Sequence, residues 1–545
     1  MNELLKTLKQ KKLQCFFLFY ILLLLPILSP IAQNLTFLDK VGIFVVCGLL
    51  FTAILLLSLF ISSRAEKIIY SVLLTISIIP GAIFLAYLLF AHVLLEQNSV
   101  TSLFETNPDE SKEFVAYYLS IWVIVGVLIY AAIPIVMIST MKSFRPLEIK
   151  KYKAIFITNI IVIIAIIGFN ELSRSVYFIN FYKTFINYKI RTAYEIKTIN
   201  ERQEKEYKIE TINQDSIPKT IVVVIGESLN KHHMSLYGYQ RKTNPLLSQL
   251  GDSIIVYNDV VSPHVHTIPV MRSVLSMNEL NNPEFFVEKP SLYELFNRAG
   301  YETFLISNQA FSEEYNSSYD ILLTLAKKKY NLSVFKQNDD ICIPVLEKVL
   351  KESQNKNRLI IIHLIGNHMA YEFRYPKEYI SFNHKKDNLV DSLPFRNEKA
   401  KRTIDKYDNS VLFNDFVIKS FIQELKKLED EHTAMIYFSD HGEEMYDYRE
   451  FAGHAYEKVS PTMCEVPFIL WMSPSYKSSR QDLIFDTGRP YSTSDLVYSI
   501  SDLAGLYYND YDDSKSLFSP KFTVKDRYVG EKDYNKIKEE FSTKE

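Results

Sequence analysis

Cysteine, glycine, proline and net charge are all scarce in this sequence of 545 residues, and each shortage excludes a class of protein. Four cysteines are too few and too scattered for a disulfide scaffold or a zinc cluster built from thiolates. Cys15 and Cys47 lie in apolar runs, so only Cys342 and Cys464 could pair, and two unpaired buried thiols are the simpler expectation. Only 15 glycines and 20 prolines, against 36 tyrosines and 36 phenylalanines, exclude a collagen-like or disordered chain. The formal net charge of -2 argues against a nucleic-acid partner, because general nucleic-acid binders carry excess positive charge.

Apolar residues are concentrated before residue 170, although their overall share of 48% is ordinary. A helix needs about 20 residues to cross the hydrocarbon core of a bilayer. We predict a five-helix transmembrane domain over residues 1–170, with spans at Leu13–Gln33, Val41–Ile61, Ile68–Leu95, Tyr117–Ser139 and Ala154–Asn170. The first run is too long for a cleaved signal peptide, and another span follows it at once.

Basic residues in the loops predict the orientation of these spans. The segments before span one, between spans two and three, and between spans four and five hold 11 Lys and Arg residues, whereas the alternate loops hold two. Because positive loops stay in the cytoplasm, the N-terminus is expected there, and five crossings place the rest of the chain on the other side. Residues 171–217, where aromatic residues alternate with Lys and Arg, suit helices lying on the membrane surface, and equally an ordinary interdomain helix.

Residues 218–545 alternate short apolar runs with helical stretches. The runs are continuously apolar, as in strands of a parallel sheet that is covered on both faces. We predict an amphipathic helix over Asp408–Asp430 and strands at Thr220–Ile225, Glu302–Ile306, Leu359–Leu364, Ala434–Phe438 and Phe468–Trp471. This alternation predicts a layered α/β domain, whose chemistry gathers at the carboxyl ends of the strands.

Polar residues with metal-binding side chains follow two of the predicted strands. Glu227 comes after the first strand, and Asp440 and His441 follow the strand Ala434–Phe438. Carboxylate and imidazole ligands suit Zn²⁺ or Mn²⁺. Either group alone would most often be a helix cap or a surface turn, but two strand-end groups in one domain, together with His368 and His454, predict one metal site.

A hydroxyl that binds a dication loses its proton more easily and becomes a nucleophile. Thr267 lies between Ser262 and Pro269, close to a predicted helix start, where it could equally be a helix cap. A helix N-terminus also favours a bound phosphate, so both interpretations are compatible. The rival Ser228 is expected to point away from the metal because side chains alternate along a strand, and Ser262 is expected to cap the turn.

The order of these motifs resembles that of the bacterial phosphoethanolamine transferases, membrane members of the alkaline-phosphatase/sulfatase superfamily. The resemblance rests on GES, MSLYGYQRKTNPLL, SPHVHTIP, GNH, YDNSVLFNDFVI, IYFSDHGEE and GHAY, taken in that order. It covers most of the chain and implies a periplasmic catalytic domain with a sulfatase/alkaline-phosphatase-like fold over residues 218–545, below an inner-membrane domain. The SLYGY-x-R-x-T-N-P and YDN…SDHG blocks are its most specific parts.

The resemblance also implies residue roles. Glu227, Asp440 and His441 would bind one zinc ion, with Thr267 as fourth ligand and nucleophile. The number of ions stays open, since a second could bind, and Mn²⁺ is less expected. The resemblance assigns phosphate or second-metal binding to His368 and His454, and ethanolamine binding to Thr106 and Glu110.

The implied reaction moves phosphoethanolamine from phosphatidylethanolamine, through a phospho-threonine, to an acceptor in lipopolysaccharide. Ser102 stands where some relatives of this family have Asn. The small number of cysteines resembles a disulfide-poor branch of the family. The acceptor could therefore be lipid A or a sugar of the lipopolysaccharide core. We expect the protein to be a monomer in contact with membrane lipids. We expect its activity to give resistance to antimicrobial peptides. The alternative is a phosphoglycerol transferase of the lipoteichoic-acid synthase type. A sulfatase fits less well, because its formylglycine motif is missing at Thr267, and a purely binding domain would not need that hydroxyl.

Overall fold

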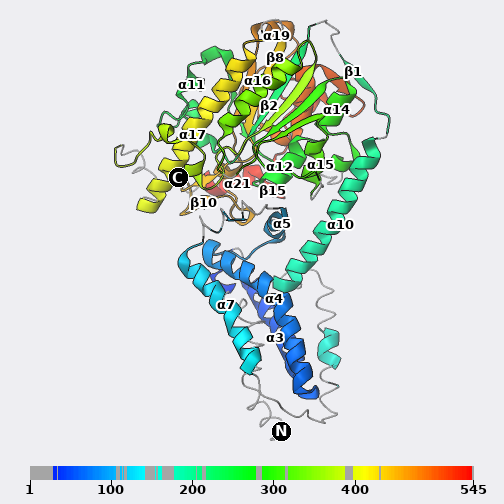
Figure 1. The fold of residues 1–545 in the computed structure, drawn as a ribbon, viewed down its shortest axis with the longest axis vertical. Helices are drawn as coiled ribbons and strands as arrows, with labels where there is room; N and C mark the ends of the chain where they lie inside the picture. Colours follow the sequence, from blue (N-terminus) through cyan, green and yellow to red (C-terminus); the bar gives the residue numbers. More distant parts are fainter. Residues whose placement is uncertain are drawn as a thin grey trace. The chain divides into compact units, whose positions relative to one another are not determined.

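The computed structural model describes most of the chain as two compact units, Met1–Ile190 (unit 1) and Arg191–Glu545 (unit 2) (Figure 1). The described residues are 29–33, 35–105, 111–112, 115, 119–140, 154, 157–162, 177–203, 205–211, 217–277, 285–313, 317–334, 336–386, 397–428 and 431–542.

Unit 1 contains three described helices that are long and apolar enough to cross a membrane. They are α3 (Phe37–Phe60), α4 (Ser63–Ala91) and α7 (Ile121–Thr140). They show that the second, third and fourth predicted spans form helices long and apolar enough to cross a membrane. The first and fifth predicted spans lie largely outside the described residues, so a count of five stays a prediction. Side chains such as Leu38 and Trp122, 79% and 80% exposed, give these helices the apolar outer surface that lipid requires.

Helix caps explain why two of these helices begin earlier than hydropathy predicts. Thr36 and Asp39 form a reciprocal capping box at the start of α3. At α4, the Ser62 side chain accepts a hydrogen bond from the backbone N–H of Ala65. The negative charge of Glu66 in the first turn interacts favourably with the positive end of the helix dipole. Charged residues are thus included in the first turn of α4, because capping, and not hydropathy, decides where a helix starts.

A single helix, α10 (Tyr177–Gln203), spans the boundary between the two units along the chain. In unit 1, Phe104 of α5 (Gln97–Glu105) packs edge-on against Phe181 and Phe185, with both ring-centroid distances at 5.1 Å. In unit 2, buried Arg202 pairs with Glu294 at 2.6 Å. The predicted bridge is therefore helical over Tyr177–Gln203, and its placement on a membrane surface stays a prediction.

Unit 2 is built on a seven-stranded sheet in the order β3-β11-β8-β2-β7-β5-β6. Five strands, from β8 to β6, are parallel. The strands are β2 (Lys219–Gly226), β3 (Ile254–Tyr257), β5 (Glu302–Ser307), β6 (Lys328–Asn331), β7 (Arg358–His363), β8 (His432–Ser439) and β11 (Phe468–Met472). All five predicted strands are confirmed, while the shorter β3 and β6 escaped prediction.

One detail of the predicted parallel sheet is wrong, because β11 runs antiparallel to both β8 and β3. Phe468, which begins β11, lies opposite Phe438 at the end of β8. The chain between them turns back at the same edge of the sheet and makes no crossover to the other end. A continuously apolar run shows that a strand is buried, but it does not give the direction of that strand.

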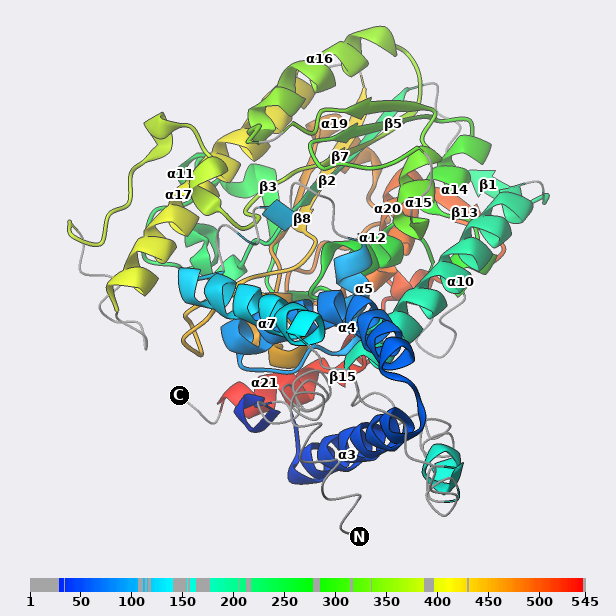
Figure 2. The ribbon, with the colours of Figure 1, turned by 60° about the horizontal axis from the view of Figure 1, so that its bottom comes forward.

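Helices cover both faces of the sheet (Figure 2). On one face Ile221, Val223 and Ile225 of β2 join a core with side chains of several helices, while α16 and α17 pack against each other on the opposite face. The first face carries α12 (Thr267–Val274), α14 (Leu292–Arg298), α15 (Ser318–Thr324) and α20 (Leu496–Ala504); the second carries α16 (Cys342–Glu352) and α17 (Glu398–Leu425). The predicted helix over 408–430 is confirmed up to Leu425, where α17 ends, and α17 begins earlier than predicted because Asn397 caps it.

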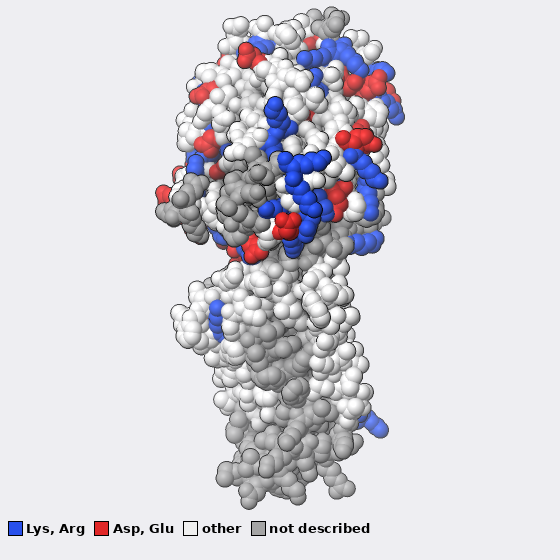
Figure 3. Space-filling view, turned by 90° about the vertical axis from the view of Figure 1, so that its left-hand side faces the viewer, with Lys and Arg blue, Asp and Glu red and all other residues white. Residues whose placement is uncertain are grey.

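The other described elements of unit 2 are short. Cys342 and Cys464 are free, buried thiols, as expected. On the face drawn in Figure 3, charged side chains of both signs are spread over unit 2, whereas the described residues of unit 1 show few. The short helices are α11 (Pro245–Ser248), α13 (Phe285–Glu288), α18 (Pro461–Cys464), α19 (Pro474–Ser479) and α21 (Tyr534–Ser542), and the short strands are β1 (Ile209–Thr211), β4 (Val260–Val261), β9 (Glu444–Met445), β10 (Ala452–Gly453), β12 (Tyr491–Ser492), β13 (Leu506–Tyr508), β14 (Tyr528–Val529) and β15 (Lys532–Asp533).

Candidate active site

Three of the predicted metal ligands meet at the carboxyl edge of the sheet. Glu227 follows β2, and Asp440 and His441 follow β8, which pairs with β2 so that Gly226 lies opposite Ser439. Their ligand atoms lie within 4.8 Å of one another, and all three side chains are fully buried. Neighbouring parallel strands thus bring together residues that are more than 200 positions apart in the sequence.

Backbone contacts fix the direction of the Asp440 carboxylate and hold the backbone of Glu227 against the loop after β7. Asp440 Oδ1 accepts hydrogen bonds from the backbone N–H groups of Ser228, at 3.1 Å, and His441, at 2.7 Å. Beside Glu227, Gly366 has a φ of 49°, and a Cβ there would lie 2.7 Å from the backbone nitrogen of Glu227. Only glycine lets the loop after β7 approach so closely.

The unsatisfied atoms of this cluster fit a metal ion. Among the described residues, Asp440 Oδ2 and His441 Nε2 are buried and have no hydrogen-bond partner. His441 Nδ1 donates to the carbonyl oxygen of Gly442 at 2.8 Å, which leaves the Nε2 lone pair free for a metal. Burial raises the pKa of Asp440 well above its ordinary value, and the charge of Glu227 raises it further. A dication would neutralise this unfavourable pair, so the residues suit Zn²⁺.

Thr267 lies beside this cluster as the first residue of α12. Its Oγ1 donates a hydrogen bond of 3.0 Å to Glu227 Oε2. Ser262 Oγ bonds to the carbonyl oxygen of His264, so Ser262 caps the turn as expected. The predicted nucleophile therefore stands next to a predicted metal ligand, at a helix N-terminus.

The expectation that Ser228 points away from the cluster is wrong. Ser228 follows the strand with a left-handed φ of 54°, so strand alternation does not apply to it, and its Oγ donates to Glu227 Oε1 at 2.8 Å. Ser228 is fully buried, however, whereas Thr267 is partly exposed. Because a nucleophile must be accessible to its substrate, exposure favours Thr267.

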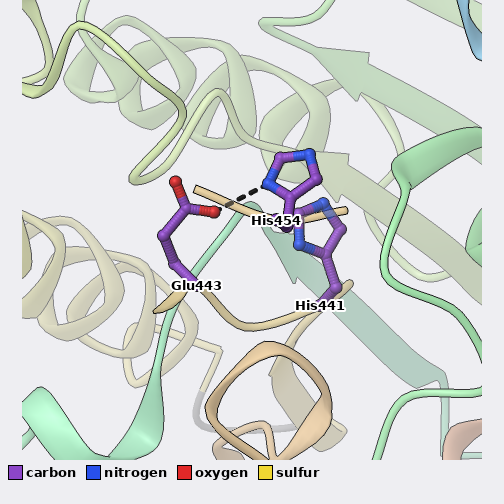
Figure 4. A group of neighbouring side chains, drawn as sticks. All are labelled: His441, Glu443 and His454. Carbon is purple, nitrogen blue, oxygen red and sulfur yellow. Dashed lines mark hydrogen bonds and ion pairs between the residues drawn. The ribbon is translucent and has the colours of Figure 1, made fainter. Parts of the chain in front are cut away.

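Two further predicted residues, His368 and His454, also lie at this site. The ring centroid of His454 is 4.2 Å from that of His441, and His454 Nδ1 donates to Glu443 Oε2 at 2.7 Å (Figure 4). Glu443 Oε1 in turn accepts from the Tyr371 hydroxyl at 2.6 Å, and burial raises the pKa of Glu443 to about 7. His368 lies in the loop after β7, and a positive charge on it acts, after the larger effect of His441, to lower the pKa of Glu227; on the pKa of Glu443 the same effect is outweighed by burial.

His441, Glu443 and His454 form a second group with metal-ligating atoms within 4.8 Å of one another. Thr106 and Glu110, the predicted headgroup contacts, lie outside the described residues. Sequence reasoning missed Glu443, Tyr371 and also Gln309, which donates a hydrogen bond to Glu227 Oε2 at 2.9 Å. Gln309 could have been found, because it follows β5 as Glu227 follows β2, whereas nothing in the sequence marked Tyr371.

The two most specific sequence blocks build a buried scaffold beside the site. Asp408 of α17 accepts hydrogen bonds from His233 Nδ1 at 2.7 Å, Tyr239 at 2.9 Å and Arg241 at 2.7 Å. Burial acts to lower the pKa of His233, but Asp408 and Asp447 outweigh it and raise that pKa to about 10. These blocks therefore attach the loop after Glu227 to α17.

Replacing Asp408 with asparagine should destabilise unit 2 by about 3–5 kcal/mol, because the buried cations of His233 and Arg241 would lose their shared anion. Denaturant unfolding of the detergent-solubilised protein would measure the change. The matched control is Glu347→Gln, which breaks an exposed pair with Lys351 and should cost less than about 1 kcal/mol. Equal effects of the two substitutions would contradict the scaffold role.

Comparisons with known proteins place this geometry in a family. A model of the sulfatase family matches residues 219–506. The crystal structure of the C-terminal periplasmic domain of EptC from Escherichia coli, in complex with Zn, is 31% identical, with a TM-score of 0.57, and the match covers 60% of this chain and 96% of that one. The chain belongs to the phosphoethanolamine transferases of the sulfatase family. It is therefore an enzyme.

Similarity to phosphoethanolamine transferases extends beyond the catalytic domain. Phosphoethanolamine transferase EptC of Escherichia coli is 29% identical over 517 residues, which cover 89% of this chain and 88% of the relative. The integral membrane lipooligosaccharide phosphoethanolamine transferase A of Neisseria meningitidis shares the fold over 93% of this chain and 98% of that one, with a TM-score of 0.68 at 18% identity. The full-length fold thus matches that of a membrane protein.

Proposed function

We propose that this transferase moves phosphoethanolamine from phosphatidylethanolamine to lipopolysaccharide through a covalent intermediate on Thr267. The observation that carries the proposal is the hydrogen bond from Thr267 Oγ1 to Glu227 Oε2, beside Asp440 Oδ2 and His441 Nε2, which have no hydrogen-bond partner among the described residues. Glu227, Asp440, His441 and Thr267 would hold one zinc ion. When bound, zinc would lower the pKa of the threonine hydroxyl and neutralise charge on the phosphoryl oxygens.

The chain's residues then perform two displacements. The hydrogen of the Thr267 hydroxyl leaves as Oγ1 bonds to phosphorus, and the bond from phosphorus to the diacylglycerol oxygen breaks. We assign the proton transfer to His454: its Nδ1 bond to Glu443 leaves the Nε2 lone pair free to take the Thr267 proton and pass it to the diacylglycerol oxygen. In the second displacement an acceptor hydroxyl oxygen bonds to the phosphorus and gives up its proton, the bond from phosphorus to Oγ1 breaks, and Oγ1 takes that proton. We assign His368 to orienting the phosphoryl group, because phosphoryl transfer depends mainly on positioning and charge neutralisation.

The apolar helices of unit 1 support a lipid donor that arrives by lateral diffusion. We propose residues 1–170 as the inner-membrane domain, 171–217 as the bridge and 218–545 as the periplasmic catalytic domain, acting as a monomer. Thr106 and Glu110 follow α5 directly in sequence, and Glu110 would face the ethanolamine ammonium.

The proposed acceptor is lipid A or a sugar of the lipopolysaccharide core. Relatives named as Kdo(2)-lipid A phosphoethanolamine 7''-transferases support the first, at 26% identity over 48% of this chain. The added amines would reduce the negative charge of the envelope and so weaken binding of cationic antimicrobial peptides. Similarity to named phosphoethanolamine transferases over most of the chain favours ethanolamine over the phosphoglycerol alternative.

Incubating the purified full-length enzyme with zinc, phosphatidylethanolamine and lipopolysaccharide tests the proposal. Mass spectrometry should find one phosphoethanolamine group added to the acceptor, and fragmentation would place it on lipid A or on the core. Phosphatidylglycerol serves as the control donor and should give no product. A phosphoglycerol adduct from that donor would instead favour the alternative function.

A further inference from the structure

Gln309 contacts a predicted metal ligand from a third strand of the sheet. It follows β5, is only 7% exposed, and its Nε2 donates to Glu227 Oε2 at 2.9 Å and to the carbonyl oxygen of Leu364 at 2.8 Å. Both partners are oxygens without hydrogens at neutral pH, so the amide nitrogen, and not the amide oxygen, must face them. The two amide hydrogens are thus both used.

These contacts hold the Glu227 carboxylate at both of its oxygens. Ser228 Oγ donates to Oε1 at 2.8 Å, while Gln309 and Thr267 share Oε2. Oε1 lies 3.4 Å from His441 Nε2. If Thr267 gives up its hydrogen, Gln309 is the one remaining side-chain donor to Glu227 Oε2 among the described residues. Without Gln309 the carboxylate could rotate and turn either oxygen toward the metal.

We propose that Gln309 is a positioning residue that fixes the Glu227 carboxylate for metal binding and keeps Oε2 facing Thr267. The inference rests on the proposed metal site and function. Hydrogen-bond partners of metal ligands typically change metal affinity or activity by about 10–100-fold when they are removed. Gln309 acts through Glu227 and needs no contact with the substrate.

Zinc affinity of the full-length protein tests this role directly. Competition with a chromophoric chelator should show Gln309→Met, which keeps the length of the side chain but loses the amide, binding zinc about 10–100-fold more weakly than the wild type. Gln309→Asn should weaken zinc binding as well, because its amide is one methylene too short to reach Glu227. Transfer by both variants at limiting zinc should fall, and excess zinc should restore much of it.

Asn297 of α14 provides a matched control. Its side chain also makes two hydrogen bonds, donating to the carbonyl oxygen of Leu325 at 3.0 Å and accepting from Thr303 at 2.7 Å, but Thr303 lies near the start of β5, at the edge away from the metal ligands. Asn297→Leu should leave zinc affinity unchanged even if it lowers the melting temperature.

Wild-type zinc affinity in both Gln309 variants, or an equal loss in Asn297→Leu, would overturn the proposal. A wild-type protein that binds no zinc would overturn it too. If Gln309→Met weakens zinc binding but the wild type transfers no phosphoethanolamine, the positioning role stands and the proposed function fails.

Discussion

Replacing Thr267 with alanine should reduce phosphoethanolamine transfer by roughly a thousandfold or more, because the variant has no oxygen to bond to phosphorus. Zinc should stay largely bound, since Glu227, Asp440 and His441 are unchanged. Thr267→Ser should keep part of the activity, because the hydroxyl remains. This contrast separates loss of the nucleophile from loss of the metal.

The covalent intermediate gives a second measurement of the same role. Wild-type enzyme incubated with phosphatidylethanolamine and no acceptor should carry phosphoethanolamine on the peptide that contains Thr267, as detected by peptide mass spectrometry. Ser228→Ala is the informative companion, because Ser228 also donates to Glu227 but is fully buried. An adduct on Ser228, or full activity of Thr267→Ala, would show that the nucleophile is wrongly assigned.

Strand-end reasoning predicted the centre of the site because the sheet has a simple geometry. Glu227 and Asp440 each follow a buried strand, and parallel pairing of β2 with β8 brings both strand ends to one edge. Hydrophobic runs marked these strands to within two residues. The same rule, applied to β5, would also have selected Gln309.

Other features depend on contacts that one sequence does not reveal. β11 is antiparallel to β8 because the chain turns back at the edge of the sheet where β8 ends. The left-handed backbone of Ser228 breaks the alternation of side chains along the strand, which had been the reason to expect Ser228 to point away from the metal. The motif blocks around Arg241 and Asp408 are strongly similar to those of the family. These two residues nevertheless form an ion pair with each other, at 2.7 Å. A specific motif can therefore report a buried scaffold as well as a catalytic group.

The substitution Asp440→Asn should lower zinc affinity more than the Gln309 variants do, by at least about 100-fold, and remove activity with it. An asparagine keeps an Oδ1 that accepts from the backbone N–H groups of Ser228 and His441, so the local fold should persist. Its amide nitrogen would take the place of Oδ2, the unpartnered atom, and would present hydrogens where a lone pair is needed. Equilibrium dialysis with zinc would measure the loss.

Thermal unfolding of the zinc-free proteins separates this effect from simple damage. Without metal, Asp440 and Glu227 are buried carboxylates beside His441, whose Nε2 lies 3.5 Å from Asp440 Oδ2, so the zinc-free melting temperatures of the wild type and of Asp440→Asn give the baseline for each protein. Added zinc should then stabilise the wild type, because it binds only the folded state, and stabilise Asp440→Asn much less at the same zinc concentration. Asp415→Asn is the control: Asp415 accepts from the backbone N–H groups of Leu246 and Leu247, so this variant should lose stability yet still respond to zinc. A zinc-induced rise in melting temperature for Asp440→Asn equal to that of the wild type would show that Asp440 is not a metal ligand.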